Sequence, residues 1–161
     1  MVHSVKTIEE AVSIANNLRH QRKIVVTTNG SFDILHIAHV NLLEKAKAEG
    51  DALFVLVNSD NSIRRFKGDN RPIIPQYQRA ELLAALKPVD YVVIFSQDTP
   101  LEYLTRIKPH VHVKGGTYIP DRTNEEKTLI EQWGGRFKFF SLEEGFSTTN
   151  IIETILQRYG K

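Results

Sequence analysis

Residues 23–39, KIVVTTNGSFDILHIAH, contain the strand-to-helix transition from which the fold can be predicted. Residues 23–28 are mostly β-branched and lack alternating polar side chains, which predicts a strand buried on both faces. Gly30 then permits a sharp turn of the backbone. Residues 40–49 carry apolar side chains at helical spacing and are followed by Gly50, so we predict a helix there. A strand, a turn and a helix in this order begin a β-α-β unit.

The rest of the chain repeats this alternation. Predicted strands cover residues 23–28, 52–57, 91–95, 111–114 and 136–140, and predicted helices cover residues 7–20, 40–49, 76–86, 100–107, 123–133 and 147–158. Strands joined by helices form parallel sheets that are covered on both faces. We therefore predict an α/β fold, a single Rossmann-like domain over residues 1–161 with a five-stranded parallel sheet and helices on both faces. Its N-terminal helix would be 7–20 and its core 23–157, with residues 58–75 as an irregular polar loop.

The composition narrows the class of protein. The chain has 161 residues, 21 Lys and Arg against 19 Asp and Glu, and no cysteine. The lack of cysteine excludes thiol catalysis, cysteine-ligated zinc and iron–sulfur clusters. No apolar run approaches the ~18 residues of a membrane span, and residues 1–6 lack the apolar core of a signal peptide. We expect a cytoplasmic protein that binds no membrane, and its net charge of +2 suits phosphorylated small molecules.

Candidate binding residues follow the predicted strands, where open α/β sheets bind their ligands. His36 and His39 are three residues apart at a helix start, where free N–H groups favour phosphate. Imidazole N–H groups there can stabilise charge that develops on phosphate oxygens. The alternative is a capping segment with two half-exposed histidines. Lys67 and Arg71 follow the second predicted strand, and they either hold phosphates or form a solvated basic loop.

Two later segments offer further candidates. Residues 114–116, Lys-Gly-Gly, end the fourth predicted strand, and the glycines either let a base or phosphate approach or end the strand. Residues 147–149, Ser-Thr-Thr, precede the last helix, where one hydroxyl suffices as a cap and three could cradle a phosphate. His110 and His112 share a strand face, but a metal site would need further ligands that the sequence does not identify. P-loop, dinucleotide-binding, nucleophile-elbow and zinc-helix motifs are absent.

Two of these segments resemble the signatures of one enzyme superfamily. Residues 30–39, GSFDILHIAH, resemble the Gly-x-Phe-Asp-x-x-His-x-Gly-His signature of the cytidylyltransferase-like nucleotidyltransferases. Residues 147–152, STTNII, resemble their second signature, and the resemblance spans residues 23–157. Shorter stretches are similar to the adenylyltransferase domain of ADP-heptose synthases, at residues 28–33, 57–60, 67–69, 71–72, 78–79, 98–100, 113–116 and 145–150.

The resemblance implies the reaction and its cofactor. D-glycero-β-D-manno-heptose 1-phosphate would attack the α-phosphate of ATP, giving ADP-heptose for lipopolysaccharide or another surface glycan, and pyrophosphate. Mg²⁺ would accompany the phosphates of ATP, and no protein ligand for it is identified. Many bacteria fuse this domain to a sugar kinase, whereas this chain resembles the stand-alone form. Members of the superfamily often dimerise, so a homodimer is possible.

The resemblance also implies roles for individual residues. His36 and His39 would stabilise the pentavalent transition state and the departing pyrophosphate. Lys67 would neutralise phosphate charge, and Arg79, which by itself would be taken for a surface arginine, would assist from its helix. Residues 114–116 would lie near the base or ribose, and residues 147–149 would hold the triphosphate. The implied nucleotide-binding residues are Thr28, Asn29, Gly30, Ser31, Phe32, Asp33, Lys114, Gly115, Gly116, Ser147, Thr148 and Thr149.

Three departures from the family pattern leave alternatives open. Ala38 replaces the glycine between the histidines, and its methyl group would weaken or re-aim nucleotide binding. Ser31 replaces a frequent cysteine, and Leu142 replaces an arginine of the cytidylyltransferases, which disfavours CTP with glycerol 3-phosphate. The alternatives are another acceptor, such as glycerol 3-phosphate with CTP or FMN with ATP, and a nucleotide-binding regulator without catalysis. An RNA-binding module built on residues 64–67 is disfavoured by the small net charge, so we expect no nucleic-acid partner.

Overall fold

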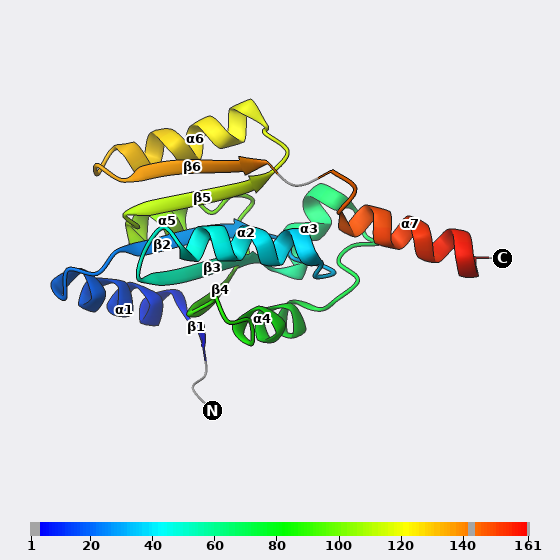
Figure 1. Ribbon diagram of the computed structural model, residues 1–161, viewed down its shortest axis with the longest axis horizontal. Coiled ribbons are helices and arrows are strands. Elements are labelled where there is room, and N and C mark those ends of the chain that lie inside the picture. Colours follow the sequence, from blue (N-terminus) through cyan, green and yellow to red (C-terminus); the bar gives the residue numbers. More distant parts are fainter. Residues whose placement is uncertain (1–3, 142–143, 161) are drawn as a thin grey trace.

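The computed structural model describes residues 4–141 and 144–160 of the chain, so Leu142 lies outside the described residues. Within them the strands form one parallel sheet of six strands in the order β1-β4-β3-β2-β5-β6 (Figure 1). The strands are β1 (Val5–Lys6), β2 (Val25–Gly30), β3 (Ala52–Asn58), β4 (Tyr91–Phe95), β5 (Val111–Gly116) and β6 (Arg136–Ser141).

The α/β fold with a parallel sheet is confirmed, but the prediction of five strands is wrong. The sixth strand is β1, which has only two residues and pairs with β4 at the edge of the sheet. Two residues are too few to show a period of hydrophobicity, so the pattern that identifies longer strands is absent there.

Seven helices lie within the described residues. They are α1 (Ile8–His20), α2 (Ile37–Lys47), α3 (Asp60–Lys67), α4 (Gln76–Ala84), α5 (Leu101–Ile107), α6 (Pro120–Glu131) and α7 (Thr148–Tyr159). Helix α3 lies where an irregular loop was predicted, and that prediction is wrong. Ser59 caps α3 by accepting a hydrogen bond from the backbone N–H of Ser62, but Ile63 is its only buried apolar residue, so few apolar side chains mark this stretch as a helix. No helix of the described chain is long and apolar enough to cross a membrane.

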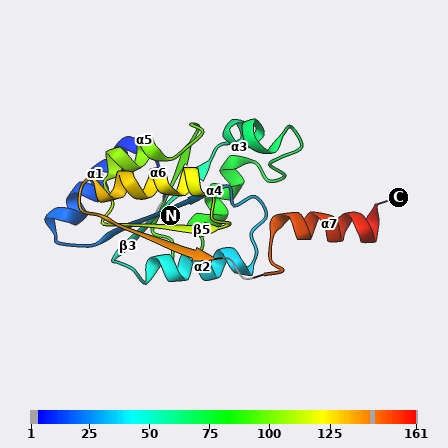
Figure 2. The same cartoon turned by 90° about the horizontal axis from the view of Figure 1, so that it is seen from above.

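The helices form a layer on each face of the sheet. Helices α2 and α4 cover one face, and α1, α5 and α6 cover the other (Figure 2). Neighbouring strand residues alternate between the two layers: Val26 packs with the α2 side and Val25 with the α1 side. Burial on both faces explains why the central strands carry no polar alternation. Helix α7 extends away from the sheet, and none of its residues is buried (Figures 1 and 2).

The order of the strands reverses beside β2. This strand pairs with β3 on one side and with β5 on the other, because the chain builds β3 and β4 first and then crosses back to β5. Ligands of open α/β sheets bind outside the carboxyl ends of the strands at such a reversal. Residues that follow β2 and β5 therefore meet at the candidate site.

Candidate active site

Two stacked histidines stand where β2 leads into α2. His36 immediately precedes α2 and His39 lies in its first turn, so the two rings face one another with centroids 3.8 Å apart and planes inclined by 24°. The His36 backbone N–H donates to His39 Nδ1 at 3.4 Å, and the Phe32 ring lies 5.2 Å from the His39 ring. Since Nδ1 accepts this bond, the proton of the neutral His39 ring is on Nε2.

Burial keeps both imidazoles neutral. It lowers the pKa of His36, and it lowers the pKa of His39 to about 4, with smaller contributions from the neighbouring His36 and Lys67 charges. At neutral pH each ring therefore offers a neutral N–H donor. The buried His36 Nδ1 has no hydrogen-bond partner within the described part of the chain.

Lys67 ends α3 and lies close enough to the histidines to affect the pKa of His39. The pKa of Lys67 is itself lowered, first by the protein atoms around its ammonium group and then by Arg71 and Arg79, while Asp33 opposes them. A bound phosphate would stabilise the charged form of an ammonium group that lies beside other cations. Lys67 thus lies near the histidine pair, and its implied neutralisation of phosphate charge stays a prediction.

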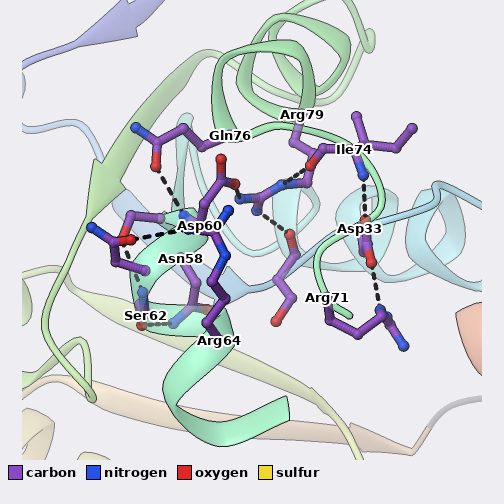
Figure 3. Close-up of polar contacts among 12 residues, drawn as sticks. Asp33, Asn58, Asp60, Ser62, Arg64, Arg71, Ile74, Gln76 and Arg79 are labelled. Atoms are coloured by element: carbon purple, nitrogen blue, oxygen red, sulfur yellow. Dashed lines mark hydrogen bonds and ion pairs between the residues drawn. The ribbon is translucent and has the colours of Figure 1, made fainter. Parts of the chain in front are cut away.

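Asp33 fastens the loop between α3 and α4 to the histidine segment (Figure 3). Asp33 is 3% exposed, and its carboxylate accepts hydrogen bonds from the backbone N–H groups of Ile73 at 2.8 Å and Ile74 at 2.9 Å and from Arg71 Nε at 2.6 Å. Burial by itself would raise the pKa of Asp33, but these backbone hydrogen bonds and Arg71 outweigh it, and the pKa is lowered. The ionised carboxylate is thus already hydrogen-bonded to protein groups.

Arg79 holds the same region from the side of α4. Its side chain is 0% exposed, so the expectation of a surface arginine is wrong. Nε donates to Ile74 O at 2.8 Å, and the two terminal nitrogens donate to Ser31 O at 2.6 Å and to Asp60 Oδ1 at 2.8 Å (Figure 3). The guanidinium group therefore ties together the end of β2, the start of α3 and the loop before α4. Its implied assistance to phosphate stays a prediction.

The second signature lies beside His36. Ser147 caps α7 by accepting from the Asn150 backbone N–H at 3.0 Å, and Thr148 Oγ1 donates to Ile34 O at 3.2 Å. The two signatures are therefore in contact although more than 100 residues separate them. They border a cavity of about 270 Å³, which is lined by His36, Gly145, Phe146, Ser147, Asn150, Ile151, Thr154 and Ile155.

A second cavity, of about 180 Å³, opens at the carboxyl ends of β2 and β5. Lys114 Nζ donates to Asn29 Oδ1 at 3.2 Å across the two strand ends and to Glu126 Oε1 of α6 at 2.9 Å. The cavity is lined by Asn29, Gly30, Ser31, Asn58, Phe66, Lys67, Phe95, Asp98, Thr99, Pro100, Leu101, Lys114, Gly115, Arg122, Glu125 and Glu126. We call this space the sheet-end cavity, and the space beside His36 the α7 cavity.

Several other predicted site residues have local structural functions. A Cβ at Gly115 would lie 2.4 Å from a terminal carbon of Leu42, so this glycine allows α2 to pack on β5. Phe32 has a positive φ of 46° in the turn after β2. Ala38 is 2% exposed and lines neither cavity, so its methyl group is covered by protein. Thr28 is buried in β2, and its hydroxyl has no partner within the described residues.

Sequence reasoning missed three residues of the site: Asp60, Arg122 and Glu126. Asp60 receives Arg79, while Arg122 and Glu126 come from α6 and line the sheet-end cavity. Asp60 lies in a stretch that resembles the family, at residues 57–60, but its pairing with Arg79, 19 residues away, was not predicted. No motif includes Arg122 or Glu126. Within residues 4–141 and 144–160, no group of three or more His, Asp or Glu side chains is placed to hold a metal ion. His112 instead contacts Thr27 and Glu126.

Comparison with known proteins agrees with this geometry. Residues 27–154 match the cytidylyltransferase-like family. The chain belongs to this family. It is 52% identical over 141 residues to the bifunctional protein HldE of Syntrophotalea carbinolica, covering 88% of this chain and 29% of HldE. It is 46% identical over 157 residues to HldE of Geobacter metallireducens, covering 98% of this chain and 32% of HldE. Membership of this family makes the chain a nucleotidyltransferase. The chain spans about a third of the length of these two relatives.

Two solved structures resemble the fold. A lipopolysaccharide core biosynthesis protein from Thermoplasma volcanium has a TM-score of 0.61 and 29% sequence identity, over 75% of this chain and 97% of that one. A pantoate–β-alanine ligase from Francisella tularensis has a TM-score of 0.64 at 15% identity, over 93% of this chain and 76% of that one. The second likeness concerns the fold alone.

Proposed function

We propose that this chain transfers the adenylyl group of ATP to a sugar 1-phosphate, and that the acceptor is D-glycero-β-D-manno-heptose 1-phosphate. The observation that carries the proposal is the stacked His36–His39 pair, which lies near two cavities. His36 lines the α7 cavity, and Lys67, which lines the sheet-end cavity, lies close enough to influence His39. The match to HldE over most of this chain supports the sugar phosphate.

The nucleotide would occupy the α7 cavity. Ser147 and Thr148 stand at the start of α7, where free backbone N–H groups favour phosphate oxygens. The acceptor would occupy the sheet-end cavity, where Lys67 and Lys114 supply positive charge for its single phosphate. This placement assigns Lys114 to the acceptor, and with it the other residues of the sheet-end cavity that the resemblance implied for the nucleotide, which are Asn29, Gly30, Ser31 and Gly115.

The reaction needs no protein nucleophile. An oxygen of the acceptor phosphate would attack the α-phosphorus of ATP, and the bond from this phosphorus to the oxygen that bridges to the β-phosphorus would break, releasing pyrophosphate. Two neutral imidazole N–H donors would stabilise charge on the non-bridging oxygens in the transition state. Positioning and electrostatic stabilisation would account for the rate enhancement.

Mg²⁺ is proposed to arrive with the triphosphate and to neutralise part of its charge. The fit to this chain is through ATP rather than through protein carboxylates, since Asp33 is already held by Arg71 and two backbone N–H groups. The donors of this chain, His36, His39 and Lys67, would bind and orient the phosphate oxygens that the cation leaves free.

The test is pyrophosphate release with ATP or CTP crossed against heptose 1-phosphate, glycerol 3-phosphate and FMN, each with Mg²⁺. Release that requires ATP and heptose 1-phosphate is the expected result. Release with a different pair would contradict the acceptor but keep nucleotidyl transfer. Release with none of the pairs, by protein that binds ATP, would contradict the proposal and favour a nucleotide-binding regulator.

A further inference from the structure

A buried chain of polar contacts runs from the centre of the sheet to the sheet-end cavity. Thr27 Oγ1 on β2 lies 2.8 Å from His112 Nδ1 on β5. His112 Nε2 lies 3.3 Å from Glu126 Oε2 on α6, and Glu126 Oε1 accepts from Lys114 Nζ at 2.9 Å. Thr27, His112 and Glu126 are all buried, so the chain reaches solvent only at Lys114.

The Glu126 carboxylate is ionised and has a partner on each oxygen. Burial acts to raise the pKa of Glu126, but the hydrogen bonds and charges of His112 and Lys114 outweigh it, and the pKa is lowered. The carboxylate lies within hydrogen-bonding distance of His112 Nε2, and the Thr27 hydroxyl lies within hydrogen-bonding distance of Nδ1 on the other side of the ring. Because an unpaired buried charge is strongly unfavourable, these two partners favour the observed orientation of the carboxylate.

Glu126 in turn fixes the ammonium group of Lys114. Lys114 carries its charge on a flexible four-carbon stem, yet Glu126 and Asn29 hold its Nζ at the wall of the sheet-end cavity. An ammonium group has three N–H donors. Two of them have acceptors among the described residues, so the third is available to a ligand. A side chain that is already ordered loses less conformational entropy when it binds.

The charges of the sheet-end cavity indicate which ligand this arrangement suits. Its cations, Lys67, Lys114 and Arg122, are matched by acidic residues 98, 125 and 126. A triphosphate would be repelled by these carboxylates, whereas a ligand with one phosphate and several hydroxyls can use both kinds of group. Carboxylate and amide oxygens accept from sugar hydroxyls, and Lys114 donates to them.

We propose that Glu126, supported by His112, is a positioning residue that aims the Lys114 ammonium group at a hydroxyl or phosphate oxygen of the polyhydroxylated acceptor. This inference rests on the proposed function, since it concerns the acceptor of the same reaction. It assigns acceptor specificity to a residue of α6 that lies outside both family signatures.

The test compares Glu126→Gln with wild type and with Glu131→Gln, a matched control at an exposed position of the same helix. The amide keeps the shape of the side chain but not its charge, so Lys114 loses the partner that orders it. We expect the KM for heptose 1-phosphate to rise about tenfold, corresponding to ~1.4 kcal/mol, while kcat and the KM for ATP stay within twofold. Lys114→Met should have the same effect, and the double variant should add little to either single change.

A merely structural role of Glu126 would lower the amount of folded enzyme and hence kcat, without separating the two KM values. If Glu126→Gln does not fold, Lys114→Met carries the test alone, because Lys114 is 22% exposed and its loss leaves Glu126 bonded to His112. A rise in the KM for ATP with an unchanged acceptor KM would overturn the inference and place Lys114 at the nucleotide.

The experiment distinguishes failure of this inference from failure of the proposed function. If wild type turns over heptose 1-phosphate and Glu126→Gln keeps the same acceptor KM, only the inference is overturned. If wild type releases no pyrophosphate, calorimetric titration with heptose 1-phosphate decides instead. A tenfold weaker affinity in Glu126→Gln then supports the inference, and equal affinities or no binding to wild type overturn it.

Discussion

Replacing His39 by glutamine should remove a pH-dependent part of the stability of the fold. In the native chain burial lowers the pKa of His39 from 6.5 to about 4. An unfolded chain therefore binds a proton at this residue over a range of pH in which the native chain does not. Protonation favours the unfolded state there, so native stability must fall as the pH is lowered from 6.5 towards 4. Glutamine does not titrate and removes this loss.

The size of the effect follows from the two pKa values. Each pKa unit between the folded and unfolded states corresponds to ~1.36 kcal/mol. At pH 5 the native state of wild type should have lost about 2 kcal/mol through His39 relative to pH 7.5, and below pH 4 the loss should level off at about 3 kcal/mol. Two other histidines, the half-buried His36 and His110, also have lowered pKa values. They remain in the variant, so the difference between the two proteins reports His39 together with its electrostatic coupling to His36.

Urea unfolding at pH 7.5 and pH 5 measures this difference. Whatever the substitution does at pH 7.5, the stability of His39→Gln relative to wild type should improve by about 2 kcal/mol at pH 5. The control is His20→Gln, because His20 lies at the exposed end of α1 and its variant should keep the wild-type pH dependence. An unchanged gap between wild type and His39→Gln at the two pH values would refute the account of His39 as a buried neutral imidazole.

Three further predictions concern the site and its supports. His36→Ala should lower pyrophosphate release about 10²- to 10³-fold, because a donor to the transition state is lost, while its thermal unfolding midpoint stays within a few degrees; retained turnover would remove His36 from the mechanism. Arg79→Met should lower the free energy of unfolding by about 3 kcal/mol, because Asp60 and two carbonyl oxygens lose a buried donor; a loss below 1 kcal/mol in urea unfolding would contradict this. Gly115→Ala should destabilise by about 1–3 kcal/mol through overpacking against Leu42, and denaturation experiments that find no loss would show that α2 can move away from β5.

The sequence predicts best what depends on neighbours along the chain. The central strands are recognisable because each carries an unbroken apolar run, and His36 and His39 share a helix face because they are three residues apart. Helix α3 escapes prediction since it has only two apolar side chains, Ile63 and the exposed Phe66, in a polar stretch. The edge strand β1 escapes because two residues show no period.

The supports of the site escape prediction for a different reason. Arg79 is buried because Ser31 and Asp60, which are 48 and 19 residues away, supply acceptors for its guanidinium group. An arginine on a short helix with one apolar side cannot be distinguished from a surface residue until those partners are placed. Glu126 is a similar case, since the reason for its burial is His112, 14 residues earlier on a strand.

The residues that hold the site in place bind different kinds of group on its two sides. On the β2 side, Asp33 and Arg79 bind backbone groups, so they fix the course of the chain around the histidines and Lys67. On the β5 side, Glu126 binds a side chain, so it fixes the place of one charge. Changes on the first side should disturb the shape of the site and hence every substrate. Changes on the second should alter recognition of the proposed acceptor alone, without moving the backbone around the histidine pair.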